Sequence, residues 1–221
     1  MNQITVMLVD DHMIVRSGAR RLLELSAEFQ IIAEADSGER ACELHSKLNP
    51  DVTIMDIHMP GMGGIEAMIR ILTKNPNAKV IILSMYERGP FVSHCLKAGA
   101  KGYLTKSSLG DELLAAAKAV AIGKNYMSSS VAQSFAIDTV TKPNNPLADL
   151  NSKEFQIFRL IAEGKEIDEI ADSLKLSSKT IANYQSIIKR KLDAVSSIDI
   201  LKIAIQHGLI EASDLEKGLD A

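Results

Sequence analysis

The residues best suited to chemistry in this sequence are aspartates that directly follow short apolar stretches. Asp10 and Asp11 come after the apolar stretch 4–9, and Asp56 ends the apolar stretch 52–55 before a turn rich in glycine. Stretches of this length are typical of buried strands, and the carboxyl ends of parallel strands are where open α/β sheets bind ligands. A single aspartate in such a position more commonly caps a turn. The prediction of a functional site therefore depends on which other side chains share that edge.

Two further polar residues follow predicted strands and would share the same edge. Ser84 ends the stretch 79–84, and Lys106 follows the stretch 102–104. Three crowded carboxylates repel one another unless a cation lies among them, and a few hard oxygen ligands suit Mg²⁺. A lysine supplies positive charge for a phosphoryl oxygen, and a serine offers a hydroxyl donor. Together these residues predict a Mg²⁺-dependent site for in-line phosphoryl transfer to a carboxylate.

Alternating strand and helix patterns, from the N-terminus to about residue 124, would position this site. Near-continuous apolar strands, each followed by a stretch with helical spacing, are typical of a parallel sheet covered on both faces. The sequence therefore predicts an α/β fold, a (βα)5 doubly wound parallel sheet. We expect strands at 4–9, 30–35, 52–56, 79–84 and 102–104, and helices at 13–25, 37–47, 64–74, 90–98 and 109–122.

The composition is that of an ordinary globular protein. Of the 221 residues, 46% are hydrophobic and 24% are charged, and the net charge of −3 gives no global sign of a nucleic-acid partner. No stretch approaches about 18 uninterrupted apolar residues, and the N-terminus lacks a signal-peptide pattern, which favours a cytoplasmic location without direct membrane association. Cys42 and Cys95 lack metal or redox spacing, and His12 and His58 lack a third matching ligand, so we expect no site for a softer metal.

The character of the sequence changes after the predicted α/β part. Residues 125–146 are polar and contain serines and prolines, which indicates a linker. Residues 147–212 have four short helical patterns and no convincing strand. Within them, a short helix near 167–174 and a longer one at about 178–192 are joined by a tight connection. This arrangement is the helix-turn-helix pattern, which predicts a small all-α domain of four helices.

Positive charge concentrates on the longer of these helices. Residues 175–191 contain five basic side chains and no acid. Ile181, Tyr184, Ile188 and Leu192 form an apolar stripe, so small and amide side chains on the other side could approach base edges in a DNA major groove while lysines contact phosphates. A solvated basic helix is the alternative. The predicted DNA-contacting residues are Lys179, Thr180, Ala182, Asn183, Ser186, Lys189 and Arg190.

Residues 1–124 resemble the receiver domains of two-component response regulators, which have a flavodoxin-like fold. The resemblance implies that Asp56 accepts the phosphoryl group and that Ser84 and Tyr103 rearrange when Asp56 is phosphorylated. Each motif alone is weak evidence, but their common order along the chain is specific. The motifs are VDDH at 9–12, MDIHMPGMGG at 55–64, LS at 83–84 and KGYLTK at 101–106.

The same resemblance implies a cofactor and partners. Asp11, Asp56 and the backbone carbonyl of His58 would hold Mg²⁺, with Asp10 close by. A histidine kinase would donate the phosphoryl group to Asp56, beside Lys106. We further expect phosphorylation to free or pair the C-terminal domains, so that the two recognition helices of a homodimer meet a double-stranded DNA site with two-fold symmetry.

The C-terminal half carries a second resemblance. Residues 150–192, LNSKEFQIFRLIAEGKEIDEIADSLKLSSKTIANYQSIIKRKL, resemble the output domain of the NarL/FixJ (LuxR-type) class of response regulators. Tyr184 stands where most of that class has histidine. This tyrosine, the stretch 142–154 and the tail AIQHGL at 204–209 resemble the GacA/UvrY/LetA subgroup. That subgroup implies control of small regulatory RNA genes and a membrane hybrid sensor kinase as partner.

These observations predict a DNA-binding response regulator that is not an enzyme, and two alternatives remain. The first is a Mg²⁺-dependent phosphatase or phosphotransferase that acts on a small substrate through an aspartyl-phosphate. Turnover of a phosphometabolite would favour it. The second is a receiver with a protein-binding output domain, in which a strong salt dependence of DNA binding would be missing. The second alternative is suggested by the acidic residues before the basic helix, Glu166, Asp168, Glu169 and Asp172.

Overall fold

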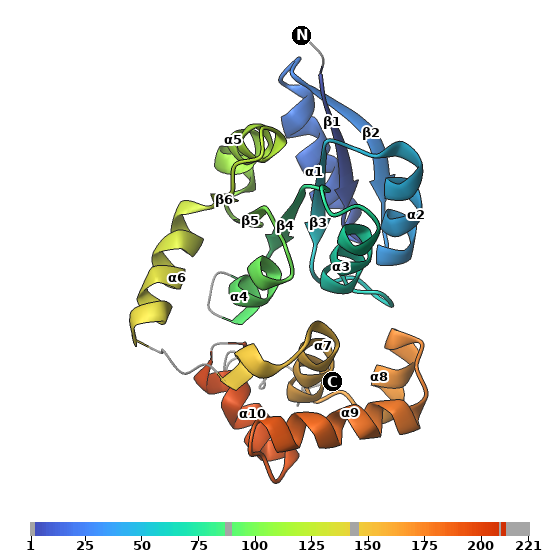
Figure 1. The fold of residues 1–221 in the computed structure, drawn as a ribbon, viewed down its shortest axis with the longest axis vertical. Helices are drawn as coiled ribbons and strands as arrows, with labels where there is room; N and C mark the ends of the chain where they lie inside the picture. Colours follow the sequence, from blue (N-terminus) through green and yellow to red (C-terminus); the bar gives the residue numbers. More distant parts are fainter. Residues whose placement is uncertain (1–2, 87–89, 142–145, 208, 211–221) are drawn as a thin grey trace.

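The chain folds into an α/β part followed by an all-helical part (Figure 1). The computed structural model describes residues 3–86, 90–141, 146–207 and 209–210. Strands and helices alternate through the first part, which confirms the predicted α/β fold. Its elements are β1 Ile4–Val9, α1 Met13–Glu24, β2 Phe29–Ala35, α2 Gly38–Leu48, β3 Val52–Asp56, α3 Gly64–Lys74, β4 Val80–Ser84, α4 Pro90–Lys97, β5 Gly102–Thr105 and α5 Leu109–Ala121.

The sheet brings the predicted site residues to one edge. Its first five strands are parallel in the spatial order β2-β1-β3-β4-β5. Every residue of β3 and of β4 is buried, as expected for central strands covered on both faces. Asp56 at the end of β3 pairs with Leu83, and Ser84 at the end of β4 pairs with Thr105. The carboxyl ends of the central strands therefore lie side by side.

The described part of the chain has one strand more than the five predicted. β6 Tyr126–Met127 adds to the edge of the sheet in parallel with β5, and the Tyr126 N–H donates to the Lys101 carbonyl at 3.0 Å. A strand of two residues has too few side chains to show an alternating pattern, which is why the sequence did not reveal it. It lies in the segment 125–146, as does the helix α6 Ser129–Thr141. Residues 142–145 of that segment lie outside the described residues.

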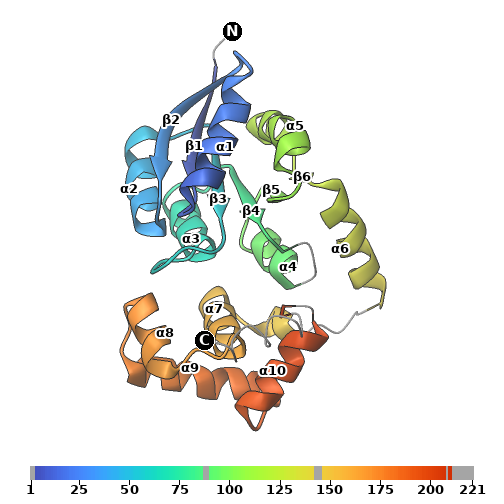
Figure 2. The same ribbon diagram turned by 180° about the vertical axis from the view of Figure 1, so that it is seen from behind.

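Two layers of helices cover the sheet. α1 and α5 pack together on one face, and α2, α3 and α4 lie on the other (Figures 1 and 2). The face under α1 and α5 is filled by a compact apolar cluster that includes Leu8, Leu23, Ile54 and Leu113. On the opposite face, the apolar cluster that contains Met68 and Phe91 from α3 and α4 continues into the all-helical part.

The all-helical part contains the helices that the sequence predicted. Of the four α-helices that the described residues form in this part, the third and longest is α9. The predicted boundary at residue 212 lies outside the described residues. These helices follow the 3₁₀ turn η1 Pro146–Asp149 and are α7 Ser152–Ala162, α8 Ile167–Leu174, α9 Ser178–Lys191 and α10 Ser197–Gln206.

Helix ends in this part are fixed by side chains. Asn151 accepts a hydrogen bond from the Glu154 N–H at 2.9 Å, while the Glu154 carboxylate accepts one from the Asn151 N–H at 2.7 Å. This is a capping box, and capping interactions of this kind each stabilise a helix start by about 1 kcal/mol. Ser196 and Asp199 form the same arrangement before α10. The starts of α7 and α10 are therefore set by local sequence.

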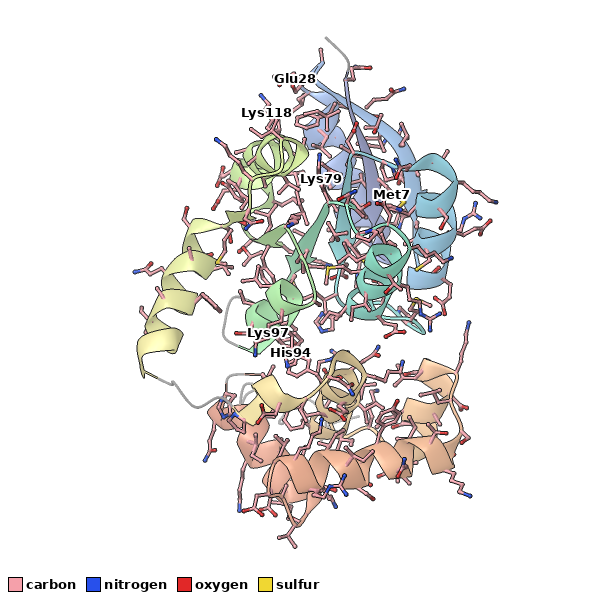
Figure 3. All side chains as sticks on the ribbon, in the orientation of Figure 1. Met7, Glu28, Lys79, His94, Lys97 and Lys118 are labelled. Atoms are coloured by element: carbon pink, nitrogen blue, oxygen red, sulfur yellow. The ribbon has the colours of Figure 1, made fainter. Side chains whose placement is uncertain are left out.

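The two parts are joined by an aromatic contact. Phe155 on α7 is buried and packs edge-on against Phe91 at 5.0 Å between ring centres, and it stacks on the ring of His94 at 4.2 Å. His94 lies on the side of α4 that faces the helical part (Figure 3). Its Nε2 lies 2.7 Å from the carbonyl oxygen of Leu147 in η1, a distance for a hydrogen bond donated by the imidazole. The contact is therefore both apolar and hydrogen-bonded.

We expect alanine at Gly64 to destabilise the protein by at least about 2 kcal/mol. A Cβ there would collide with the backbone oxygen of Asp56, because α3 begins directly against the end of β3. The matched control is Gly18→Ala in α1, where no atom lies within 4 Å of the added carbon and alanine should stabilise the helix by about 0.5–1 kcal/mol. Urea unfolding of both variants measures the difference; equal stability of the two would contradict the packing described for β3 and α3.

Candidate functional site

Lys106 joins two of the buried carboxylates that the sequence singled out. Its Nζ lies 2.9 Å from Asp56 Oδ2 and 2.9 Å from Asp10 Oδ2. Asp56 is 1% exposed and Asp10 is 3% exposed, while the lysine side chain keeps 11% exposure. The Lys106 N–H also donates to the Ser84 carbonyl at 2.7 Å, which fixes the start of the lysine side chain beside the end of β4. The structure thus brings four predicted residues together.

Burial and the ion pairs act in opposite directions on these groups. Burial raises the pKa of Asp56 above its ordinary value, although the hydrogen bond and charge of Lys106 oppose the rise. For Lys106, burial lowers the pKa, but the hydrogen bonds to Asp56 and Asp10 outweigh it and the net pKa is raised. The lysine therefore stays protonated, and its positive charge is what keeps two neighbouring carboxylates stable in a buried place.

The acidic residues at this edge fit a hard cation. Asp10, Asp11, His12 and Asp56 each offer one ligand atom, and these atoms all lie within 4.8 Å of one another. Asp56 Oδ1 is buried and has no hydrogen-bond partner among the described residues, so one lone pair of the central carboxylate remains available. Carboxylate oxygens with room for water are the ligands that Mg²⁺ prefers. The donor set is thus suited to the expected Mg²⁺.

The side chain of His58 does not take part in this donor set. Its ring is mostly buried and lies 5.0 Å from the Tyr86 ring and 5.6 Å from the Phe91 ring. Burial lowers the pKa of His58 to about 3, and the charge of Arg159 contributes to the fall. The backbone N–H of His58 favours the charged form of Asp56 and so acts to lower the pKa of that carboxyl. His58 is thus a neutral residue of the loop after β3 that contacts Asp56 through its backbone.

Ser84 and Tyr103 converge on one residue of the loop after β4. Tyr103 is fully buried, and its hydroxyl donates to the Tyr86 carbonyl at 2.8 Å. The Tyr86 N–H donates to Ser84 Oγ at 3.1 Å. Burial raises the pKa of Tyr103 well above its ordinary value, so the phenol remains a hydrogen-bond donor. The two residues that the sequence marked as a switch therefore both hold the backbone of Tyr86.

The site opens into a cleft between the two parts of the chain, which we call the interdomain cleft. Its volume is about 480 Å³, enough for a small phosphorylated molecule. One wall carries Asp11, Asp56 and Lys106, and the opposite wall carries Gln156 and Arg159 from α7. This second wall could not be predicted from the sequence. The residues of α7 have the pattern of an ordinary amphipathic helix, and the position of α7 over the site depends on packing between distant elements.

The predicted DNA-contacting residues all lie on accessible parts of α9. This helix lies along the side of the helical part that faces away from the sheet in both views (Figures 1 and 2). Ile181 and Ile188 of its apolar stripe are fully buried. The exposed members of the predicted set are Lys179, Asn183, Ser186 and Arg190, and the half-buried members are Thr180, Ala182 and Lys189.

Two of the five basic residues in this region serve the fold instead. Lys191 lies 2.7 Å from the buried Glu154 carboxylate and donates to the Asp149 carbonyl, so it ties the end of α9 to the start of α7. Lys175 lies 3.6 Å from Glu39 of the α/β part. In the described part of the chain, Lys179, Lys189 and Arg190 form no ion pair, so their charges remain available to an outside anion.

Comparison with known families assigns both halves. Residues 6–118 match the family described as response regulator receiver domain, and residues 148–204 match the family described as bacterial regulatory proteins, luxR family. The two matches together cover most of the chain. The protein therefore belongs to the two-component response regulators that carry a luxR-type helix-turn-helix domain.

Relatives extend over almost the whole chain. Response regulator GacA of Pseudomonas aeruginosa is 36% identical over 212 residues, which are 95% of this chain and 99% of that protein. Response regulator UvrY of Escherichia coli K12 is 36% identical over 214 residues, which are 96% of this chain and 98% of that protein. The resemblance to the GacA and UvrY subgroup is confirmed.

Solved structures show the same two-part architecture. RcsB from Salmonella enterica serovar Typhimurium, bound to promoter rprA in the presence of the phosphomimetic BeF₃⁻, matches with a TM-score of 0.69 at 27% identity, over 91% of this chain and 98% of that chain. Another RcsB structure from Salmonella typhimurium matches with a TM-score of 0.71 at 29% identity, over 91% of this chain and 96% of that chain. Among the described residues, no helix is long and apolar enough to cross a membrane.

The buried histidine predicts a pH dependence of stability. Because the folded state keeps His58 neutral down to about pH 3, the unfolded state binds a proton that the folded state does not at any pH between that value and 6.5. Stability should therefore fall as the pH drops below 6.5. Between pH 7.5 and 5.5 the contribution of this one residue is about 1.4 kcal/mol.

The measurement is urea unfolding at both pH values for the wild type and His58→Gln. The glutamine variant should lose about 1.4 kcal/mol less on acidification than the wild type. An identical pH dependence in the wild type and His58→Gln would contradict the assignment.

Proposed function

We propose that Asp56 is the phosphoacceptor of this response regulator and that a histidine kinase is its phosphate donor. A carboxylate oxygen of Asp56 attacks phosphorus, and the bond from phosphorus to the donor's imidazole nitrogen breaks with its electron pair left on nitrogen. The observation that carries the proposal is the ion-paired group Asp10, Lys106 and Asp56 at the mouth of the interdomain cleft. Lys106 is placed to neutralise charge on the transferring group.

The residues present also support a Mg²⁺ cofactor. Asp10, Asp11, Asp56 and the backbone carbonyl of His58 would hold the ion, and the first three of these offer ligand atoms within one small cluster. Mg²⁺ would bind a phosphoryl oxygen and reduce the repulsion between the donor and the carboxylates. Ser84 ends the neighbouring strand and supplies a hydroxyl on the same edge of the sheet.

The switch then passes through Ser84 and Tyr103 to the output domain. Phosphorylation adds about −1.5 to −2 charges at pH 7 and strong acceptor oxygens, which would compete for the Ser84 hydroxyl. A shift of Ser84 releases its bond to the Tyr86 backbone, which Tyr103 also holds. The Tyr86 ring stacks on Phe91 at 4.3 Å, and Phe91 contacts Phe155. The conformational change therefore has an unbroken path of packed rings into α7.

The output of the switch is binding to double-stranded DNA by a phosphorylated homodimer. Because α9 already faces away from the receiver, its contact residues need not be uncovered, and pairing of two copies is the step that phosphorylation would control. Two recognition helices related by a two-fold axis would then read two half-sites. RcsB is bound to promoter DNA in the presence of the phosphomimetic BeF₃⁻ in two solved structures, which supports DNA binding in the phosphorylated state.

The biological setting follows from the relatives. The similarity to GacA and UvrY supports control of small regulatory RNA genes, phosphorylation by a membrane hybrid sensor kinase and a cytoplasmic location without direct membrane association. The domain organisation that we propose is a receiver at residues 1–124, a connecting segment at 125–146 and a luxR-type DNA-binding domain at 147–212. The connecting segment contains β6 and α6, so much of it is structured.

We expect Asp56→Asn to abolish phosphate-dependent DNA binding while leaving basal binding intact. The amide keeps the shape of the side chain but cannot form the acyl phosphate. Binding to a candidate promoter library is measured by fluorescence anisotropy with and without acetyl phosphate and Mg²⁺. The wild type should bind about tenfold more tightly after phosphorylation, within the usual range of coupling between sites. If acetyl phosphate increased the DNA affinity of Asp56→Asn as much as that of the wild type, the proposed mechanism would be contradicted.

Lys179→Ala should weaken DNA binding about threefold to tenfold near 0.1 M salt and reduce the slope of log affinity against log salt by about 1. The reason is that Lys179 is exposed on α9 and has no ion pair among the described residues. Lys118→Ala on α5 is the control, because that lysine pairs with Glu28 on the far side of the receiver (Figure 3). A slope unchanged in Lys179→Ala would support a protein-binding output domain instead.

A further inference from the structure

The strongest unexplained feature of the molecule is a cation on the wall of the interdomain cleft that faces Asp56. Arg159 belongs to α7 of the output domain, yet it lines the same cleft as Asp56 and Lys106. It also lines a smaller adjoining cavity with His58 and Gln156. The Gln156 side chain lies against Gly63 of the loop after β3, so this part of α7 is in contact with the receiver. The position of Arg159 is therefore fixed relative to the phosphoacceptor loop.

The hydrogen-bonding capacity of Arg159 is mostly unused. Its side chain is only 16% exposed, and in the described part of the chain it makes a single hydrogen bond, from Nη1 to Glu163 Oε1 at 2.7 Å. A guanidinium carries five N–H donors in a planar fork. A largely buried guanidinium with one partner retains donors for an anion in the cleft. The planar fork of a guanidinium suits bidentate binding of phosphoryl or carboxylate oxygens.

The charges around Asp56 favour an additional cation once a phosphoryl group is bound there. Asp10, Asp11 and Asp56 contribute three negative charges, and Lys106 is already shared between Asp10 and Asp56. A bound Mg²⁺ and Lys106 together balance these three carboxylates. A phosphoryl group adds further negative charge that they do not balance. Arg159 is the other basic side chain, apart from histidines, on the described lining of the cleft.

We propose that Arg159 is a phosphoryl-binding residue, contributed by the DNA-binding domain to the phosphorylation site of the receiver. The inference rests on the proposed phosphorylation of Asp56. Arg159 binds the non-bridging oxygens of the donor's phosphoryl group while an Asp56 carboxylate oxygen attacks phosphorus. With acetyl phosphate, the bond between phosphorus and the acetate oxygen breaks, and acetate leaves with its electron pair. Arg159 neither gives nor takes a proton in this step.

The consequence is a direct electrostatic link between Asp56 and the output domain. A phosphoryl group on Asp56 competes with Glu163 for the guanidinium, and both members of that pair lie on or next to α7. α7 packs against α9. Charge at Asp56 therefore acts on the DNA-binding domain through Arg159 as well as through Ser84 and Tyr103, and by linkage the position of α7 affects how readily Asp56 is phosphorylated.

The test is the rate at which the full-length protein is phosphorylated by acetyl phosphate with Mg²⁺, followed on phosphate-affinity gels over a range of donor concentrations. Arg159→Ala should lower the rate at subsaturating donor about tenfold and raise the donor concentration needed for half-maximal rate. Arg159→Lys keeps a cation without the fork and should lower the rate only about threefold. Arg70→Ala is the matched control, because Arg70 forms the same i,i+4 pair with Glu66 but does not line the cleft. It should stay within twofold of the wild type.

Asp56→Asn in the same series separates two kinds of failure. If the wild type is not phosphorylated, or Asp56→Asn is phosphorylated as fast, the proposed function itself fails. If the wild type is phosphorylated at Asp56 and Arg159→Ala reacts within twofold of it, or no more slowly than Arg70→Ala, only the role of Arg159 is overturned. Should Arg159→Ala fail to fold, Arg159→Lys and Glu163→Gln decide. The role of Arg159 is supported if Arg159→Lys is phosphorylated more slowly than the wild type and Glu163→Gln is phosphorylated at least as fast as the wild type. Any other result overturns the role of Arg159.

Discussion

Lys106 lies between Asp10 and Asp56, with its Nζ 2.9 Å from a carboxylate oxygen of each, where neither aspartate is more than 3% exposed. Removing one partner of such a buried group leaves an uncompensated charge, which is strongly destabilising. The parallel sheet creates the need for this lysine, because β1 and β3 are neighbours, Asp10 directly follows β1 and Asp56 ends β3. The same ammonium that compensates the two buried carboxylates is the charge that lies beside the phosphoryl group in the function we propose. Stability and chemistry at this edge therefore depend on one side chain.

The second constraint is the continuity of the apolar core from receiver to output domain. The cluster that fills the α2–α4 face includes Phe91 of the receiver and Phe155 and Phe158 of α7. A buried aromatic contact of this kind contributes about 0.5–1.5 kcal/mol beyond its area. The ring contact therefore adds a modest, geometry-dependent free energy to the apolar packing between the two domains. Domain contact is thus a natural place for regulation.

In the helical domain, some charged residues stabilise the fold and others remain available to bind DNA. Lys191 and Glu154 tie α9 to α7, and Ser178 donates to Asp168 at 2.6 Å, which fixes the angle between α8 and α9. The acidic helix α8 therefore supports the recognition helix from behind. This accounts for acids beside a basic helix without invoking a protein partner, in agreement with the match to the luxR family. Ion pairs inside the domain leave the remaining cations of α9 available for DNA phosphates.

The amino-acid sequence was enough to predict most of the helices and strands and the edge of the sheet where the aspartates, Ser84 and Lys106 meet. Apolar strands that end in, or are directly followed by, aspartate, serine or lysine are local signals in the sequence. The carboxyl ends of parallel strands lie at the same edge of a sheet, so these residues are expected to meet there. The recognition helix α9 could be predicted in the same way, because its apolar stripe and its basic residues lie within one continuous stretch of sequence. Strand β6 was not predicted, because a strand of two residues is too short to show an alternating pattern. The folded protein alone shows that Arg159 lines the same cleft as Asp56 and that Lys191 pairs with Glu154. Those contacts join segments far apart in the chain, and their geometry follows from how whole helices pack, which no local pattern encodes.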